Sequence, residues 1–302
     1  MILIGGLNDA EKLSGIGLGN MVMNLLPYAL MIGLNTALET LVSHAYGRKN
    51  LHECGLYLHR AIFLMICFFI PIALSFQRIE DFLVLIGVDE TTAGYANEYL
   101  ICLLPAILMN TIGDSVDIFL ISMGYNNVVC NIQMYALPIH FFICWIFVNF
   151  LDWGIKGAAL ANNLTALITL VGQIIYVDSF KEIKDAWFLP TMKTFDKIWP
   201  FLKLALPGIL MLVIENLNME ILVLLAGMLH SADMLAAQVI LVAFGQFMIM
   251  IPYGLALAAV SMVGHSLGAN RAAEARENCK LVTVVSNFVF YVLIMVLHYN
   301  SS

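Results

Sequence analysis

Long apolar segments follow one another along the whole chain, and they constrain its fold more than any other feature. The 302 residues are 61% hydrophobic and 12% charged, with a mean hydropathy of +0.89. A helix needs about 20 mainly apolar residues to cross a bilayer, and lipid offers its backbone no other hydrogen-bond partners. The sequence therefore predicts an all-α polytopic membrane protein with eight transmembrane helices. The eight segments run at about Ile16 to Val42, Leu56 to Phe76, Tyr95 to Ser122, Val128 to Leu151, Ile155 to Val177, Ile198 to Ala226, Leu235 to Val263 and Leu281 to Leu297.

Two of these segments repeat each other. Gly33 to Gly47 reads GLNTALETLVSHAYG, and Gly254 to Gly268 reads GLALAAVSMVGHSLG, at a constant offset of 221 residues without a gap. Glycines coincide in the two copies, and so do His44 and His265. A period this long indicates two homologous halves about a pseudo-symmetry axis, which is how many transporters build a substrate path between two lobes.

Charge and cysteine content exclude other classes. The net charge of −7 is spread over several loops and gives no support for nucleic-acid binding. The six cysteines have no paired spacing, so neither a metal site nor a disulfide framework is predicted. If successive loops alternate sides, eleven of the fourteen basic residues share one side, which the positive-inside rule places in the cytoplasm.

One segment, residues 179–197, breaks the apolar pattern by mixing lysines and acidic residues with aromatic ones. We expect it to be a cytoplasmic linker between two lobes. A solvated connector is preferred to the alternative, an amphipathic stretch at the membrane surface. The predicted organisation is then an N-lobe over residues 1–178, this linker, and a partial C-lobe over residues 198–302.

Three motifs lie in and beside the spans. Leu38 to Gly47 reads LETLVSHAYG and is followed by LHRA at Leu58 to Ala61, while Trp153 to Asn162 reads WGIKGAALAN. Ile251 to Arg276 reads IPYGLALAAVSMVGHSLGANRAAEAR. Together these motifs resemble the second helix, the entry to the sixth helix and the eighth helix of the multidrug and toxic compound extrusion (MATE) family, in its eukaryotic branch.

The resemblance implies a MATE-like two-lobe helical bundle with an internal repeat. In that twelve-helix fold, two six-helix bundles face each other in a V, and substrate binds between them. The eight spans would be helices two to nine, with a stub of helix one before Gly15 and helices ten to twelve absent. On this interpretation the chain is truncated at both ends.

Two glutamates, Glu215 and Glu220, lie inside the sixth span. A charged group near the bilayer centre costs about 2.5 to 3.5 kcal/mol on insertion scales, so each must face a cavity, pair with another group or hold a proton. Their five-residue spacing turns them about 140° apart, so one would be the carrier and the other a packing partner. The resemblance makes Glu215 the proton carrier, although Asn216 and Leu217 replace the family's aromatic pair, which weakens the expectation of flat organic cations. Alternatively, both glutamates only form hydrogen bonds between helices, with groups such as Asn218.

A second acidic pair, Asp114 and Asp117, lies in the third span. Residues three apart share a helix face, so both could line a cavity in the N-lobe and bind a cation or a proton. They also lie within about three turns of the span end near Tyr125, and a structural or interfacial placement is preferred.

Other polar residues on the spans are weaker candidates. Asn216 and Asn218 lie beside the glutamates, and four more residues on helices expected to border the cleft could contact substrate: Asn20, Asn24, Gln246 and Tyr253. We expect Glu39 to pair with a basic group such as Arg60, and His140 to form a hydrogen-bonded helix contact.

The resemblance implies an antiporter that exports small organic, often cationic, compounds or xenobiotics in exchange for protons by alternating access, with sodium coupling less favoured. The expected partners are the substrate, the coupling proton and the lipid bilayer; no cofactor is expected, and the chain would be monomeric in the plasma membrane or in a vacuolar or other endomembrane. Two alternatives remain: a lipid-linked saccharide flippase of the same superfamily, and a truncated membrane fragment that does not transport. An enzyme is not expected, because no motif such as His-Glu-x-x-His occurs.

Overall fold

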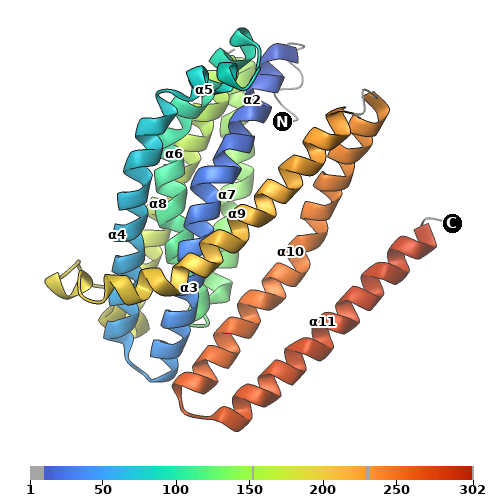
Figure 1. Ribbon diagram of the computed structural model, residues 1–302. Coiled ribbons are helices and arrows are strands. Elements are labelled where there is room, and N and C mark those ends of the chain that lie inside the picture. The colour runs from blue at the N-terminus through green and yellow to red at the C-terminus, as the bar shows by residue number, and fades with distance from the viewer. Residues whose placement is uncertain (1–9, 152, 229–231, 301–302) are drawn as a thin grey trace.

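The computed structural model describes residues 10–151, 153–228 and 232–300, and every regular element in these ranges is a helix (Figure 1). The elements are α2 (Ala10–Met23), the π-helical turn η1 (Asn24–Tyr28), α3 (Ala29–Gly47), α4 (Leu51–Phe76), α5 (Ile79–Leu85), α6 (Glu90–Ser122), α7 (Asn126–Trp145), the π-helical turn η2 (Ile146–Phe150), α8 (Gly154–Asp178), the 3-10 turns η3 (Lys181–Ala186) and η4 (Met192–Thr194), α9 (Ile198–Met228), α10 (Ala232–Gly268) and α11 (Ala272–Asn300). Seven helices in the described ranges are long and apolar enough to cross a membrane. The prediction of an all-α polytopic membrane protein is confirmed.

The first expected span, Ile16 to Val42, is helical throughout but is not one of these seven. It divides into α2 and α3 at the π-turn η1, which contains Pro27. Proline cannot donate a backbone hydrogen bond, and π-turns interrupt helices, often near functional sites. Because α2 has only 14 residues, the two helices together, and not α2 alone, have the length of a span.

Side-chain caps fix where two of the spanning helices begin. The Asn50 side chain accepts a hydrogen bond from the Glu53 amide at the start of α4 (3.2 Å), and Asp89 accepts one from the Thr92 amide at the start of α6 (3.4 Å). Such caps satisfy amides that have no partner within the helix. Hydrogen bonds from the Thr91 hydroxyl and from the Thr92 amide also lower the pKa of Asp89 below its usual value.

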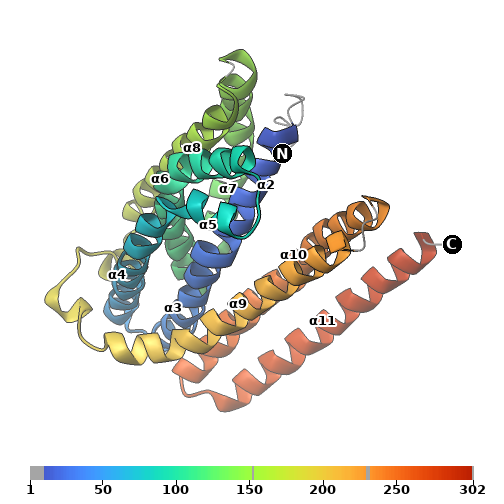
Figure 2. The same cartoon turned by 45° about the horizontal axis from the view of Figure 1, so that its top comes forward.

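The helices form an N-terminal group, α2 to α8, and a C-terminal group, α9 to α11 (Figures 1 and 2). The groups meet at the lower end of Figure 1, where α3 packs against α9 and α10, and they diverge toward the upper end. One apolar core joins α3, α4 and α6 to the first half of α9, and another lies among α2, α6 and α8. The division into two lobes at residues 178 and 198 stays a prediction, and the lobes would correspond to these groups.

The connections α3–α4, α8–α9 and α10–α11 all lie at the lower end (Figure 1). These connections contain most of the basic residues that the sequence assigns to one side, among them Arg48, Lys49 and Arg271. The structure therefore brings them to one end of the bundle, and the positive-inside rule predicts that this end is cytoplasmic.

The two copies of the sequence repeat meet at the same end. A Cβ atom added at Gly47 would overlap the backbone of His265, and a Cβ atom at Gly268 would overlap the backbone of His44. The contact is reciprocal, so it keeps the 221-residue offset of the repeat. Glycine is needed at both positions because the backbones of α3 and α10 approach each other this closely.

The linker packs along α4, a contact that the sequence did not predict, while most of its described residues, among them Leu189 and Met192, are exposed. The Arg60 guanidinium of α4 donates hydrogen bonds to the carbonyls of Lys193 and Thr194, both at 3.1 Å, and the His59 ring nitrogen Nε2 lies 2.6 Å from the carbonyl oxygen of Phe188. Linker carbonyls need partners wherever the chain leaves water, and α4 supplies them. The linker is therefore docked along α4 of the N-terminal group.

Candidate functional site

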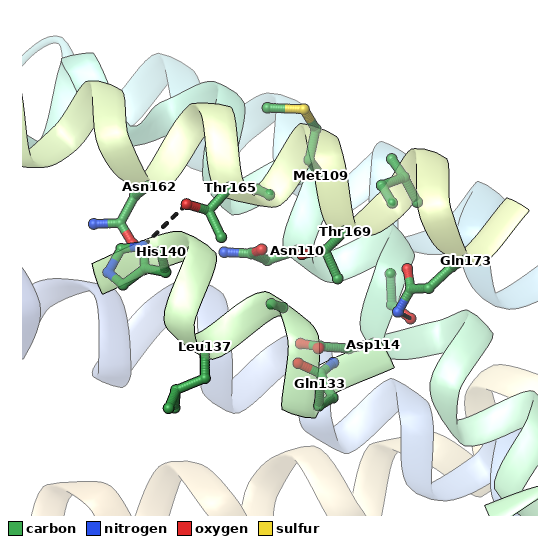
Figure 3. A pocket seen from close by; sticks show the side chains of 14 residues that line it. Met109, Asn110, Asp114, Gln133, Leu137, His140, Asn162, Thr165, Thr169 and Gln173 are labelled. Atoms are coloured by element: carbon green, nitrogen blue, oxygen red, sulfur yellow. Dashed lines mark hydrogen bonds between the residues drawn. The ribbon is translucent and has the colours of Figure 1, made fainter. Parts of the chain in front are cut away.

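A cavity of about 360 Å³ lies inside the N-terminal group, between α6, α7 and α8 (Figure 3). Apolar residues form part of its wall, and its polar lining consists of Asn110, Asp114, Gln133, His140, Asn162, Thr165, Thr169 and Gln173. Ionisable side chains within spanning helices face the interior or a cavity and mark substrate or ion paths. This cavity is therefore the candidate functional site.

Asp117 is held behind the cavity wall by the amides of two lining residues. It is 8% exposed, and its Oδ2 and Oδ1 atoms accept hydrogen bonds from Nε2 of Gln133 and from Nε2 of Gln173, each at 2.8 Å. Gln133 comes from α7 and Gln173 from α8, so the carboxylate connects three helices. We infer that Asp117 organises the cavity wall, because bonds to a carboxylate are among the stronger hydrogen bonds.

Asp114 lies one turn earlier on α6 and points into the cavity (Figure 3). Its side chain is exposed, whereas that of Asp117 is buried, although both come from one helix face. The exposure results from the cavity, since protein surrounds the site on the side of α7 and α8. Asp114 is thus the carboxylate that a cation or proton entering the cavity would meet first.

The α8 wall of the cavity is a polar stripe. Asn162, Thr165, Thr169 and Gln173 follow one another at spacings of three, four and four residues, which places them on one face of a helix. The ring nitrogen Nδ1 of His140 lies 3.0 Å from the hydroxyl of Thr165, the kind of helix contact expected for this histidine. Sequence reasoning missed the stripe, and its helical spacing within an apolar span was the signal that could have found it.

A second cavity of about 200 Å³ adjoins the first and shares Asn110 and Asn162 with it. Asn20 lines this second cavity, and its side-chain oxygen accepts a hydrogen bond from the Tyr99 hydroxyl at 3.3 Å. Tyr28 of the π-turn η1 lines it as well. The polar space therefore extends from α8 to α2 and to the break in the first span.

Asn163, next to the cavity residue Asn162, fixes the shape of α6. Its side-chain oxygen accepts a hydrogen bond from the amide of Ala106, and its Nδ2 donates to the carbonyl of Cys102, both at 2.8 Å. In a regular helix that amide and that carbonyl would bond to each other. The asparagine is instead inserted between them beside Pro105, and such insertions are a recognised cause of helix bending.

The candidates on α9 lie apart from these cavities. Glu215 and Asn218 are exposed, and Glu220 lies in α9 with its side chain outside the part of the chain that the structure describes. Asn216 donates from Nδ2 to the backbone carbonyl of Asn24 at 3.2 Å. The C-terminal group thus contacts the N-terminal group at η1 as well as at the lower end.

The two candidates on α10, Gln246 and Tyr253, have different surroundings. Gln246 is exposed. Tyr253 is 46% exposed, and its hydroxyl is close enough to Asp114 and Glu39 for electrostatic interaction. Tyr253 therefore brings a polar group of the C-terminal group near two carboxylates of the N-terminal group.

The expected ion pair between Glu39 and Arg60 does not form. Arg60 is 4% exposed, and its guanidinium is directed to the linker carbonyls. The Oε1 atom of Glu39 is buried and accepts no hydrogen bond. The prediction was wrong because the sequence alone does not show that the linker returns to α4.

The described residues contain no group of three or more His, Cys, Asp or Glu side chains that could hold a metal ion. The six cysteines are free. Asp114 and His140 are the described ionisable side chains that line this cavity, and Asp114 is the carboxylate of the two.

The spanning helices and their arrangement in two groups define an integral multi-pass membrane protein. The chain belongs to the MatE family, whose members are transporters and not enzymes; the family model, described as MatE, matches residues 1–146 and 207–302.

Plant proteins are among its relatives. The chain is 27% identical to Protein DETOXIFICATION 36 of Arabidopsis thaliana over 285 residues, which cover 94% of this chain and 57% of that protein. It is 29% identical to Protein DETOXIFICATION 51 of the same plant over 286 residues, or 94% of this chain and 53% of that protein. The chain therefore spans about half the length of the curated relatives that it matches.

Solved structures share the fold. The crystal structure of the eukaryotic MATE transporter AtDTX14 superimposes with a TM-score of 0.87 at 24% identity, covering 94% of this chain and 63% of that one. A mutant of the Vibrio cholerae MATE transporter VcmN gives a TM-score of 0.86 at 18% identity, covering 99% of this chain and 67% of that one. The expected MATE-like helical fold is confirmed.

Proposed function

We propose that this protein is an antiporter that exports small organic, often cationic, compounds or xenobiotics in exchange for protons by alternating access. The observation that carries the proposal is Asp114, an ionisable side chain facing a polar cavity between spanning helices. A carboxylate in a membrane domain is retained against its cost where it binds an ion, a proton or a substrate. Membership of a transporter family supports export, and we place the protein in the plasma membrane or in a vacuolar or other endomembrane.

Competition at one carboxylate would couple the two fluxes. A cationic substrate and a proton both bind the oxygen atoms of Asp114, so the binding of one excludes the other. The two helix groups contact each other at one end and diverge at the other (Figure 1). Rocking between this arrangement and its opposite would present the site to each side of the membrane in turn. Tyr253, on the C-terminal group, lies near Asp114 and would let the site respond to that motion.

Glu215 is the second coupling residue that we propose. It is exposed on α9, on the C-terminal group, and its neighbour Asn216 contacts η1. A carboxylate there would take up a proton on the side where the groups diverge, with Glu220 as its packing partner on the same helix. Protons are proposed as the coupling ion in preference to sodium because the sequence resembles the eukaryotic branch.

Transport by the purified chain in liposomes tests the proposal. With a pH gradient across the membrane and ethidium as the organic cation, wild-type protein should move ethidium against its concentration gradient. Asp114→Asn should reduce this coupled movement to the level of protein-free liposomes, because the asparagine amide does not ionise and so cannot take up and release a proton. Glu215→Gln should do the same.

Asp81→Asn is the matched control, since Asp81 is an exposed carboxylate of α5 in a loose pair with Arg78 (3.6 Å). This variant should transport ethidium at the wild-type rate. Wild-type coupled transport by Asp114→Asn, at equal amounts of reconstituted protein, would show that the cavity carboxylate is not the coupling group. A sodium gradient that replaces the pH gradient without loss of rate would overturn proton coupling.

A further inference from the structure

Glu39 of α3 is a buried carboxylic side chain in the middle of a contact between the two helix groups. It is 7% exposed, and its Oε1 atom is buried without a hydrogen bond. Burial removes the hydration that stabilises an ionised carboxylate, and here neither a cation nor a donor replaces it at that atom. In this packed arrangement the ionised form of the Glu39 side chain is therefore disfavoured relative to the neutral form.

The neighbours of Glu39 on its own helix show where it points. Asn35, one turn before it, is hydrogen-bonded to Ser115 of α6 (3.2 Å), and Ser43, one turn after it, lies against Gly264 of α10. Residues four apart share a helix face. Glu39 thus faces the seam where α3 and α6 of the N-terminal group meet α10 of the C-terminal group.

The sequence repeat shows that packing alone does not need this carboxyl group. In the repeat register Val260 of α10 is equivalent to Glu39, just as Gly268 is equivalent to Gly47. The glycine contact is reciprocal, but the position two turns away has an ionisable side chain in one copy and an apolar side chain in the other. An apolar residue of similar size suffices for the seam, so the carboxyl group has another role.

Among the residues that the structure describes, no ionisable side chain pairs with Glu39 as a counter-charge. Tyr253 of α10 lies near Glu39, and a neutral phenol provides no cation. On the other neighbouring helices the groups are engaged elsewhere or exposed: Arg60 on the linker carbonyls, Glu53 with Arg48, Asp117 on two glutamines, Asp114 in the cavity, Lys203 and Glu215 exposed on α9, and His265 on the carbonyl of Ser122.

We propose that Glu39 is a proton-binding site of the contact between the groups, protonated while α3 and α10 are packed together and deprotonated when they separate. Separation would admit water to the seam, and the proton would pass from the carboxyl oxygen to that water. Because the packed state binds one more proton than the separated state, acid favours packing and packing favours proton uptake.

This proposal deepens the proposed function. It rests on one part of that function, namely that the two helix groups move relative to each other. It assigns a further proton site, besides Asp114 and Glu215, at the end where the basic connections lie; this site controls the conformation and does not contact substrate. A single proton can change the ratio of packed to separated molecules by at most about tenfold for each pH unit.

Distance measurements at that end of the molecule test the proposal. Lys49 and Ala269 are exposed, come from different groups, and line one cavity of about 400 Å³. Both would be changed to cysteine for spin labelling, in the full chain with its six native cysteines replaced by serine, and measured by electron-electron resonance in lipid nanodiscs from pH 5 to pH 8. The expected result is a short distance at low pH and a growing population at longer distance as the pH rises.

Glu39→Gln should keep the short distance at every pH, because its side chain is neutral in both states. Glu39→Met is a second neutral variant in case the amide perturbs folding, and it should give the same result. Glu53→Gln is the control, since Glu53 is a half-buried carboxylate at the same end that is paired with Arg48, and it should keep the wild-type pH dependence.

A wild-type distance that does not change with pH would overturn the proposal, and so would an unchanged pH dependence in either neutral variant. Asp114→Asn separates this test from that of the proposed function. That variant should lose coupled ethidium transport but keep the pH-dependent distance. Transport therefore tests the proposed function, and the distance tests the Glu39 proposal independently.

Discussion

The helices α6 and α11 have nearly the same apolar character but very different surroundings. Their most apolar 18-residue windows have mean hydropathies of 1.5 and 1.6, yet half of the α6 window is buried inside the molecule and none of the α11 window is. α6 runs through the N-terminal group, whereas α11 packs on α10 at the edge of the C-terminal group (Figure 1). Hydropathy therefore selects helices that leave water, and it does not tell whether lipid or protein covers them.

Polar side chains inside the helices mark the difference more clearly. On α6, Asp117 and Ser115 are buried and bonded to other helices. On α11, Asn287 is exposed and donates to the Thr283 carbonyl of its own helix (2.8 Å). A polar group that bonds to another spanning helix helps to determine how the two helices pack. A polar group that bonds within its own helix has no such effect on packing. If this comparison is right, equivalent substitutions should have unequal effects in the two groups.

The largest difference is expected for two glycines that the repeat makes equivalent. A Cβ atom at Gly33 would lie 2.5 Å from the Cα atom of Ile209, whereas nothing lies within 4 Å of a Cβ atom at Gly254. Gly33→Ala should lower the free energy of unfolding by about 3 kcal/mol, at the upper end of overpacking costs because the neighbour is backbone. Gly254→Ala should raise it by about 0.5 to 1 kcal/mol, since alanine is the better helix former.

Thermal unfolding of both glycine variants in the same detergent measures this difference. Equal melting temperatures for Gly33→Ala and Gly254→Ala would mean that α3 and α9 do not approach each other as closely as the structure has them.

A smaller effect is expected for the asparagines. Asn163→Leu should destabilise the protein by about 2 kcal/mol, because it leaves the Ala106 amide and the Cys102 carbonyl without their partners. Asn287→Leu should change the stability by less than about 0.5 kcal/mol, as exposed substitutions usually do. Urea or thermal unfolding of the two variants, compared with wild type, checks both values. A larger loss for Asn287→Leu would break the comparison between the groups.

The smallest of the three effects is expected where the linker is docked. Arg60→Ala should cost about 1 kcal/mol, because the linker carbonyls partly recover hydrogen bonds from water once they are released. Limited trypsin digestion should then cut the linker, which contains Lys181, Lys184 and Lys193, several times faster than in wild type. Arg276→Ala, at an exposed position of α11, should leave the linker as resistant as before. Equal digestion rates in all three proteins would contradict docking of the linker on α4.

Some features of the site were readable from sequence and others were not. The helical face shared by Asp114 and Asp117 followed from their spacing, but their different environments depend on Gln133 and Gln173, which come from two other helices. The Arg60 contact to the linker joins residues more than 130 positions apart, so local patterns contain no information about it. The docked linker and the unpartnered Glu39 are two results of that single contact.

The sequence by itself determined that this chain lies in a membrane, that it is helical, that its halves repeat and that it resembles the MATE family, because these properties depend on local composition and spacing. The tertiary structure decided which carboxylates are bonded, which face a cavity and which are buried without a partner. The physical reason is that burial and pairing of a charge depend on atoms from distant parts of the chain, and the chain brings those atoms together only when it folds.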